Sequence, residues 1–263
     1  IGGGNMASAI IGGLIHQGLP ASQIEVVEPW AEAREALRKN YGIEAQAEAG
    51  PALQRAQIVV WAVKPQTFRD AAAQAKAHTQ GALHLSVAAG IRSDSIAQWL
   101  GTERIVRTMP NTPALVGKGM SALYARPAVS APERQSIEAI MATTGEFLWV
   151  DSEPQLDAVT ALSGSGPAYV FYFLEAMTRA GTDMGLTAAQ AHQLAVGTFV
   201  GASELARRSD ETPAVLRQRV TSKGGTTYAA LQSMEHDAVA EKFMQAMQAA
   251  RQRAHELGDE FGK

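Results

Sequence analysis

A change of pattern near residue 151 constrains the fold of this chain more than any other feature. Before it, short apolar and β-branched runs alternate with alanine-rich amphipathic segments. Such alternation is typical of βαβ units and a mostly parallel sheet covered by helices. After it, the β-rich runs stop and the pattern becomes helical. We therefore predict an α/β domain over residues 1–151 and an all-α domain over residues 152–263.

The individual elements follow from the same pattern. The chain opens on Ile1 and a glycine cluster, which we interpret as the end of a strand whose earlier residues are missing from the sequence. Further strands are predicted at 24–27, 57–63, 82–87, 104–108, 120–123 and 147–150, separated mainly by helical segments such as 31–39 and 66–77. In the second domain we predict helices at 168–184, 188–207, 212–219, 228–234 and 238–257.

Composition excludes several classes of protein. Apolar residues make up 46% of the 263 residues, enough for a substantial core. The formal net charge is only −3, and acidic and basic residues are mixed along the chain, which argues against a nucleic-acid or membrane partner. No run approaches the roughly 18 apolar residues of a membrane helix. The absence of cysteine excludes disulfides and thiolate metal sites, and we expect no metal centre and a cytoplasmic location.

The first residues carry a candidate cofactor site. The run Gly2-Gly3-Gly4-Asn5-Met6-Ala7 leads directly into a helical segment and fits the dinucleotide fingerprint of a Rossmann-type domain. Glycines there allow a tight strand-to-helix turn, and the pyrophosphate lies on amides at the helix N-terminus. Glycine triplets also occur in plain turns, but a second strand follows. That strand ends where a ribose-binding acid is expected. The predicted cofactor contacts are Gly2, Gly4, Asn5, Met6 and Glu28.

Glu28 bears on the choice of cofactor. Its carboxylate could accept bonds from both ribose hydroxyls of NAD and would repel the 2′-phosphate of NADP. The equally open alternative is that Glu28 faces water while Arg34 or Arg38 receives the phosphate. The residues therefore predict NADPH or NADH without choosing between them.

Further turns are expected at the same edge, because parallel strands end there together. Pro65 directs the chain outward after one strand. Lys64 beside it could lie over the cofactor, although a solvated lysine is the simpler explanation. The cofactor contacts predicted from these turns are Ala62, Val63, Lys64, Pro65, Ala88, Ala89, Gly90 and Asn111.

One segment of the helical domain differs from its surroundings. The run Val220-Thr221-Ser222-Lys223-Gly224-Gly225-Thr226-Thr227 places two glycines and several hydroxyl groups between two predicted helices. Free amides at a helix N-terminus form a pocket for an anion such as a carboxylate. An ordinary turn with a threonine N-cap also explains this segment taken alone.

Several segments resemble the motifs of pyrroline-5-carboxylate reductases. The first is Pro213-x-x-Leu216-x-x-x-Val220-Thr221-Ser222-x-Gly224-Gly225-x-Thr227-x-x-Ala230-Leu231-x-x-Met234-Glu235. The others, in the family's order, are Gly2-Gly3-Gly4-Asn5-Met6, Ala62-Val63-Lys64-Pro65-Gln66, Ser86-Val87-Ala88-Ala89-Gly90-Ile91, Arg107-Thr108-Met109-Pro110-Asn111-Thr112-Pro113 and Leu162-Ser163-Gly164-Ser165-Gly166-Pro167-Ala168-Tyr169. The resemblance covers essentially the whole chain, and the combination is specific.

The resemblance implies NADPH- or NADH-dependent reduction of the cyclic imine 1-pyrroline-5-carboxylate to L-proline, the last step of proline biosynthesis. It also implies that the loop amides hold the substrate carboxylate and that the catalytic residue Thr227 reaches the ring nitrogen. Relatives often carry glutamate where this chain has Asp210, which puts a direct role for Asp210 in doubt. The implied substrate-binding residues are Val220, Ser222, Gly224, Gly225, Thr226 and Thr227.

Self-association is expected on two grounds. The run 168–174 is apolar on every side, and a small helical domain can hardly enclose it alone. The family resemblance implies a helical domain that interleaves with a second copy, so we predict a homodimer or a pentamer of dimers. In the last helix one apolar stripe faces either its own domain or the partner: Val239, Phe243, Met247, Ala250, Ala254 and Leu257.

Two other functions are compatible with part of this pattern. Some 3-hydroxy-acid dehydrogenases also combine a Rossmann domain with a helical one, and they resemble one another in using a catalytic lysine within a helix. In this chain the only lysine well inside a helix of the second domain is Lys242, and it lies on the polar face of that helix, which argues against this function. A protein that binds the dinucleotide only to sense it or to assemble is the alternative outside enzymes. None of the helical domain's histidines, His192, His236 and His255, is visibly paired with a carboxylate as a general acid would be.

Overall fold

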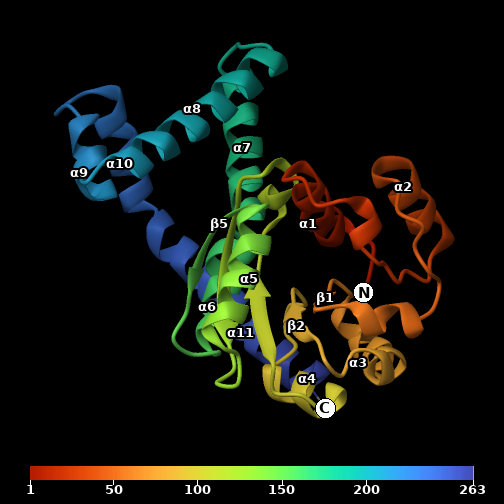
Figure 1. Cartoon of the computed structure of the whole chain (residues 1–263). Helices are drawn as coiled ribbons and strands as arrows, with labels where there is room; N and C mark the ends of the chain where they lie inside the picture. The colour runs from red at the N-terminus through yellow and green to blue at the C-terminus, as the bar shows by residue number, and fades with distance from the viewer. Residues whose placement is uncertain (263) are drawn as a thin grey trace. The chain divides into compact units, whose positions relative to one another are not determined.

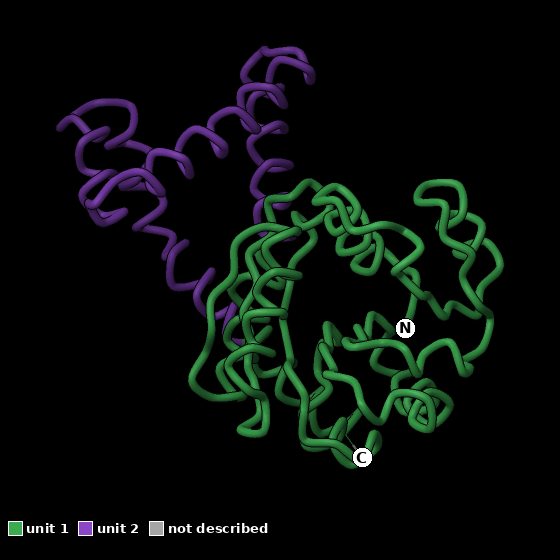
Figure 2. Tube along the Cα trace, in the orientation of Figure 1, with its two compact units in different colours: residues 1–167, 249–263 green, residues 168–248 purple. Residues whose placement is uncertain are grey.

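The computed structural model describes residues 1–262 as two compact units (Figure 1 and Figure 2). The first unit comprises residues 1–167 and the C-terminal stretch from residue 249, and it is built around a sheet. The second unit, residues 168–248, is helical.

The first unit contains a five-stranded sheet in the order β1-β2-β3-β4-β5. All neighbouring strands are parallel except β3 and β4, which are antiparallel. The exception arises because the short segment η4 (Thr112–Val116) joins these two strands, and a parallel pair needs a longer crossover. The predicted mostly parallel sheet is therefore confirmed. The strands are β1 Ile58–Trp61, β2 Leu83–Ser86, β3 Ile105–Met109, β4 Gly119–Ala125 and β5 Gly145–Trp149.

The prediction of a strand at 24–27 is wrong. This segment makes a single isolated parallel bridge, between Val27 and Gln46. On its other side lies Ile1: Gly2 N donates to Val27 O, and Ala62 N donates to Ile1 O, both at 2.8 Å. With so few backbone groups beside it, the segment forms no continuous ladder.

Helices cover both faces of the sheet, because successive strand side chains point to opposite faces. Trp61 and Ile105 face α3, α4 and the end of α11, while Leu85 and Leu123 face α5. A separate cluster joins α1 to α2. The elements are α1 Asn5–His16, α2 Ala31–Tyr41, α3 Pro65–Ala75, α4 Ser93–Leu100, α5 Ala131–Ala142 and α6 Gln155–Val159, with short segments η1 Ala21–Gln23, η2 Pro51–Arg55, η3 Lys76–His78 and the π-helical η5 Thr160–Gly164.

The helical region confirms the predicted helices with small changes at their ends. Its elements are α7 Gly166–Asp183, α8 Ala188–Arg208, α9 Pro213–Arg219, α10 Thr226–His236 and α11 Val239–Phe261. Within the second unit, Phe243 of α11 packs edge-on against Tyr169 and Phe173 of α7, with ring centroids 5.5 and 5.7 Å apart. Farther along α11, Leu257 lies against Gly90. The apolar stripe of α11 therefore faces its own chain at both places.

The two units do not divide at residue 151. Leu156 of α6 and Ala161 of η5 are buried in the first unit, so its compact part continues past β5. The end of α11 belongs to the first unit as well, where Ser95 Oγ donates to Gly262 O at 2.8 Å. The domain boundary at 151/152 stays a prediction, and Lys263, the last residue of the predicted second domain, lies outside the described residues.

Candidate active site

Gly2 and Gly4 shape an open turn at the start of α1. At Gly2 the backbone has φ +93°, and an added Cβ would lie 2.4 Å from Ala62 O. At Gly4, the N-cap residue of α1, an added Cβ would meet nothing within 4 Å. No side chain caps this helix and no acid lies in its first turn. Asn5 and Met6 therefore begin a helix whose free amides can bind an anion.

Glu28 lies inside the glycine turn. It is 9% exposed; its Oε2 accepts a bond from Gly3 N at 2.7 Å and its Oε1 from Trp30 N at 2.9 Å. The alternative in which Glu28 faces water is therefore wrong. Arg34 donates to the carbonyls of Glu28 and Pro29. A contact of Glu28 with the ribose stays a prediction, and the carboxylate also holds the glycine turn in shape.

Lys64 and Trp30 meet across two neighbouring turns. Lys64 is the N-cap residue of α3 and Pro65 is the first residue of that helix, as a proline at N1 allows. The ammonium of Lys64 lies 5.6 Å from the ring centroid of Trp30, whose side chain is largely exposed. Since Ala62 N donates to Ile1 O, the turn after β1 adjoins the glycine turn. Trp30 was not predicted as a site residue. Its exposed ring beside Lys64 makes it a further candidate contact.

The turn after β2 is confined on one side by α11. Ala88 is 5% exposed, and its amide donates to Ser86 Oγ at 3.3 Å. Gly90 has φ +73°, and an added Cβ would lie 2.8 Å from Leu257 Cβ. The glycine at this position is required by the approach of α11, whether or not the turn also contacts a cofactor.

Asn111 is engaged inside the protein. Its Nδ2 donates to the backbone and hydroxyl oxygens of Ser163, each at 3.2 Å, and its Oδ1 accepts from Met120 N at 2.9 Å. The side chain therefore ties the turn after β3 to η5. A π-helical turn of this kind is frequent at functional sites. A contact between Asn111 and the cofactor stays a prediction.

The predicted substrate loop lies in the second unit and leads into α10. Gly224 has φ +76°, and Gly225 is the N-cap residue of α10, with no side-chain cap. The alternative of a threonine N-cap is therefore wrong. Gly225 N donates to Ser222 O at 2.9 Å, so the amides without a partner in the helix begin at Thr226 and include that of Thr227. The remaining predicted loop residue, Val220, is largely exposed.

One histidine departs from expectation. His255 Nδ1 lies 3.4 Å from Asp157 Oδ2, so this histidine does have a carboxylate partner. The pair lies in the first unit, and its side chains belong to α11 and α6. Among residues 1–262 no cluster of three or more histidine and acidic side chains could hold a metal ion. Over the same residues no helix is both long and apolar enough to span a bilayer.

An uncapped glycine turn that opens a helix beside a parallel sheet defines a Rossmann-type protein that binds a dinucleotide. Its reaction class is that of the NAD(P)-dependent oxidoreductases, since the family model described as NADP oxidoreductase, coenzyme F420-dependent, matches residues 1–90. The model described as pyrroline-5-carboxylate reductase dimerisation matches residues 153–257.

Relatives along the full chain specify the family. The chain is 44% identical over 265 residues to a pyrroline-5-carboxylate reductase of Pseudomonas aeruginosa, covering 100% of this chain and 97% of the relative. Among solved structures, the Coxiella burnetii pyrroline-5-carboxylate reductase has a TM-score of 0.89 and 37% identity, with 97% of this chain and 96% of that one covered. A Plasmodium falciparum pyrroline carboxylate reductase with NADP bound has a TM-score of 0.88 and 27% identity, covering 98% and 96%. The chain belongs to the pyrroline-5-carboxylate reductase family.

Proposed function

We propose that this protein reduces 1-pyrroline-5-carboxylate to L-proline with NADPH or NADH, in proline biosynthesis. The observation that carries the proposal is a pair of uncapped helix N-termini, at Gly4 for the dinucleotide pyrophosphate and at Gly225 for the substrate carboxylate. Both ends offer free amides and a helix dipole to a negative group. A cytoplasmic location is part of this proposal.

The protein needs to supply little acid catalysis in this reaction. Reduction of a C=N bond places a hydride on carbon and a proton on nitrogen. A nicotinamide cofactor supplies the hydride. The cyclic imine binds already protonated, so the task of the protein is to hold the substrate in a productive orientation. The amides of the 220–227 loop hold the carboxylate, and the Thr227 hydroxyl accepts a hydrogen bond from the ring nitrogen.

The reaction is tested by following cofactor oxidation. We expect NADPH or NADH to be oxidised when 1-pyrroline-5-carboxylate is added, and L-proline to form. When a 3-hydroxy acid is added together with the oxidised cofactor, we expect no reduction of the cofactor. Turnover of the hydroxy acid would favour the dehydrogenase alternative, whereas cofactor binding without either reaction would favour a sensor.

Thr227→Ala should lower kcat/KM for 1-pyrroline-5-carboxylate by about 1 to 3 kcal/mol in transition-state free energy, the scale of a hydrogen bond to a charged group. The matched control is Thr221→Ala, because Thr221 Oγ1 donates to Arg217 O within the chain and Thr221 is not among the predicted substrate contacts. Steady-state kinetics with both variants provide the measurement. If kcat and KM of Thr227→Ala equal those of the wild type, Thr227 has no part in the reaction.

We also propose that the second unit is completed by a second copy of the chain. Within residues 168–248, all of which the structure describes, Ala191 and Ala195 are the only buried apolar side chains. A helical unit with so small a core is not stable alone. Its large exposed apolar residues are Val170, Phe171, Tyr172, Met177, Met184, Leu186, Leu194, Val200, Leu205, Val215, Val220, Tyr228, Met234 and Met244. The pentamer of dimers is one assembly that such a dimer permits.

Gly197→Leu should convert the dimer to monomer and abolish most of the activity. In the single chain, a Cβ at Gly197 or Gly201 meets nothing within 4 Å, so a helix of a second copy has room to pack closely against α8. A leucine side chain at Gly197 would occupy that room and keep the two helices apart. Light scattering at micromolar concentration measures the change. Gly50→Leu is the control, because Gly50 is equally open and lies in the first unit. An active wild-type monomer would contradict the proposed assembly.

A further inference from the structure

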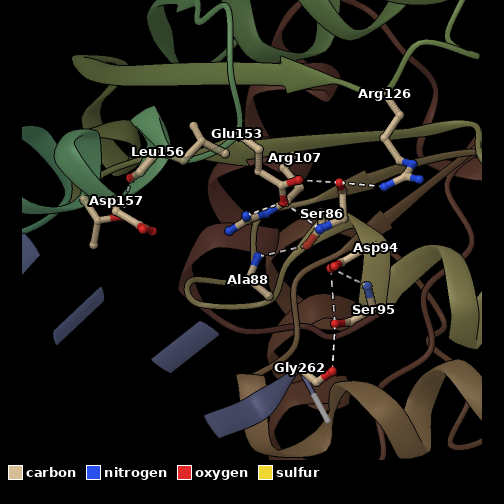
Figure 3. Close-up of polar contacts among 12 residues, drawn as sticks. Ser86, Ala88, Asp94, Ser95, Arg107, Arg126, Glu153, Leu156, Asp157 and Gly262 are labelled. Carbon is tan, nitrogen blue, oxygen red and sulfur yellow. Dashed lines mark hydrogen bonds and ion pairs between the residues drawn. The ribbon is translucent and has the colours of Figure 1, made fainter. Parts of the chain in front are cut away.

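A partly buried carboxylate joins three elements of the first unit. Glu153 lies in the turn between β5 and α6. Its Oε1 accepts bonds from Ser93 N and from Arg107 Nη1, each at 2.6 Å, and its Oε2 accepts from Ser93 Oγ. Arg126 donates to Ser93 Oγ at 3.0 Å. Figure 3 shows Glu153 beside Arg107, with Arg126 on the other side. We refer to these four residues as the Glu153 cluster.

The Glu153 cluster is charged and largely enclosed. The side chain of Arg107 is 9% exposed and that of Glu153 is 19% exposed. Ser93 is fully buried. Removing one partner of such a pair leaves the other charge without compensation, a larger change than the loss of a surface ion pair. The carboxylate also lies at the N-terminus of α4, where the helix dipole favours a negative charge.

Apolar packing already attaches α4 to the sheet. Ile91 and Ile96, on either side of Ser93, are fully buried in the cluster that includes Trp61. Hydrophobic burial is not directional, whereas hydrogen bonds to a backbone amide set its position. The contribution of Glu153 is therefore to determine where the backbone at Ser93 lies.

The backbone at Ser93 is the exit of the turn after β2, residues 87–92, which contains the predicted cofactor contacts Ala88, Ala89 and Gly90. The entry of this turn is held by the bond from Ala88 N to Ser86 Oγ, visible in Figure 3. Its outer side is held by α11, through Leu257 at Gly90 and the ion pair of Arg92 with Asp259 at 2.6 Å. Glu153 supplies a further attachment at the exit, through Ser93.

We infer that Glu153 is a positioning residue that holds the 87–92 turn in the conformation that binds the dinucleotide. This inference rests on the proposed cofactor site. Glu153 acts through Ser93 and Arg107 and does not itself touch the cofactor. A carboxylate is needed for this role, because one group must accept from an amide, a hydroxyl and a guanidinium together.

The test compares Glu153→Ala and Glu153→Gln with the wild type by fluorescence titration of NADPH in the absence of substrate. Displacement of a binding turn by about 1 Å is expected to weaken cofactor binding on the order of tenfold to a hundredfold. The KM for the imino acid at saturating cofactor should stay within about twofold, because the carboxylate loop is not altered. Glu138→Gln is the control, since Glu138 accepts a bond from Trp149 Nε1 at 2.6 Å outside this cluster.

Formate separates positioning from a merely structural role. Added formate should restore NADPH binding in Glu153→Ala, where it can occupy the vacated space between Arg107 and Ser93, but not in Glu153→Gln, where the space is filled. Ser93→Ala, which keeps the charge pair, serves if the other variants do not fold, and it should show a smaller loss of affinity.

Unchanged cofactor affinity in folded variants would overturn the inference. So would a loss of thermal stability with a parallel loss of all activities and no effect of formate. Because binding is measured without the imino acid, a wild type that binds NADPH but does not reduce the imine would refute the proposed reaction alone. A wild type that binds neither NADPH nor NADH would refute the cofactor site and this inference together.

Discussion

Gly2→Ala should destabilise the first unit by about 2 to 5 kcal/mol. An alanine at φ +93° costs roughly 1 to 2 kcal/mol of backbone strain, and a Cβ 2.4 Å from Ala62 O adds about 1 to 3 kcal/mol of overpacking. The Ala62 amide donates a hydrogen bond to Ile1 O, so a Cβ that pushes Ala62 away would also displace the glycine turn. Displacement of this turn would weaken cofactor binding. Urea unfolding and NADPH titration measure the two effects.

Two other glycines separate the causes. Gly18 has a similar φ of +96° and nothing within 4 Å of an added Cβ, so Gly18→Ala carries the backbone strain without the clash. Gly4→Ala carries neither, because φ at Gly4 is −75° and the space there is open. We expect Gly4→Ala to keep its stability but to bind NADPH more weakly, since the methyl group would occupy the pyrophosphate site. Unchanged affinity in Gly4→Ala would contradict the assignment of this turn.

Below pH 6.5 the protein should lose about 3 kcal/mol of stability through His84. His84 is 1% exposed in β2, and burial lowers its pKa from 6.5 to about 4. Its Nδ1 accepts a bond from Trp61 Nε1 at 3.0 Å, which requires the neutral ring. Because folding lowers this pKa, the unfolded chain binds the additional proton. The stabilisation is full above pH 6.5 and is lost as the pH falls toward 4.

Urea unfolding between pH 4 and 7 measures this loss. His84→Gln should remove most of the slope, because a glutamine oxygen can still accept from Trp61 and nothing titrates. His192→Gln, at an exposed position of α8, should keep the slope. An identical slope in His84→Gln and the wild type would show that other groups cause the acid sensitivity.

The local elements could be predicted because their causes are local. Alternating apolar residues place Leu83 and Leu85 on one face of β2, and the backbone freedom of the glycine run 2–4 marks the turn into α1. The uncapped N-terminus of α10 is of the same kind, since Gly225 and the hydroxyl residues beside it are contiguous. The segment 24–27 was mispredicted because a strand also needs neighbouring backbone, which its own apolar pattern does not supply.

Apart from the segment 24–27, the sequence alone thus determined the order of the main helices and strands, together with the glycine turn at α1 and the family. Tertiary structure alone decided how particular side chains are used. Glu28 turns inward to the amide of Gly3, and Gly90 makes room for Leu257 from the opposite end of the chain. Arg107 and Glu153, 46 positions apart, form a charge pair that no local motif marks. Such contacts depend on which distant groups the packed core brings together, and burial then requires each polar group to find a partner.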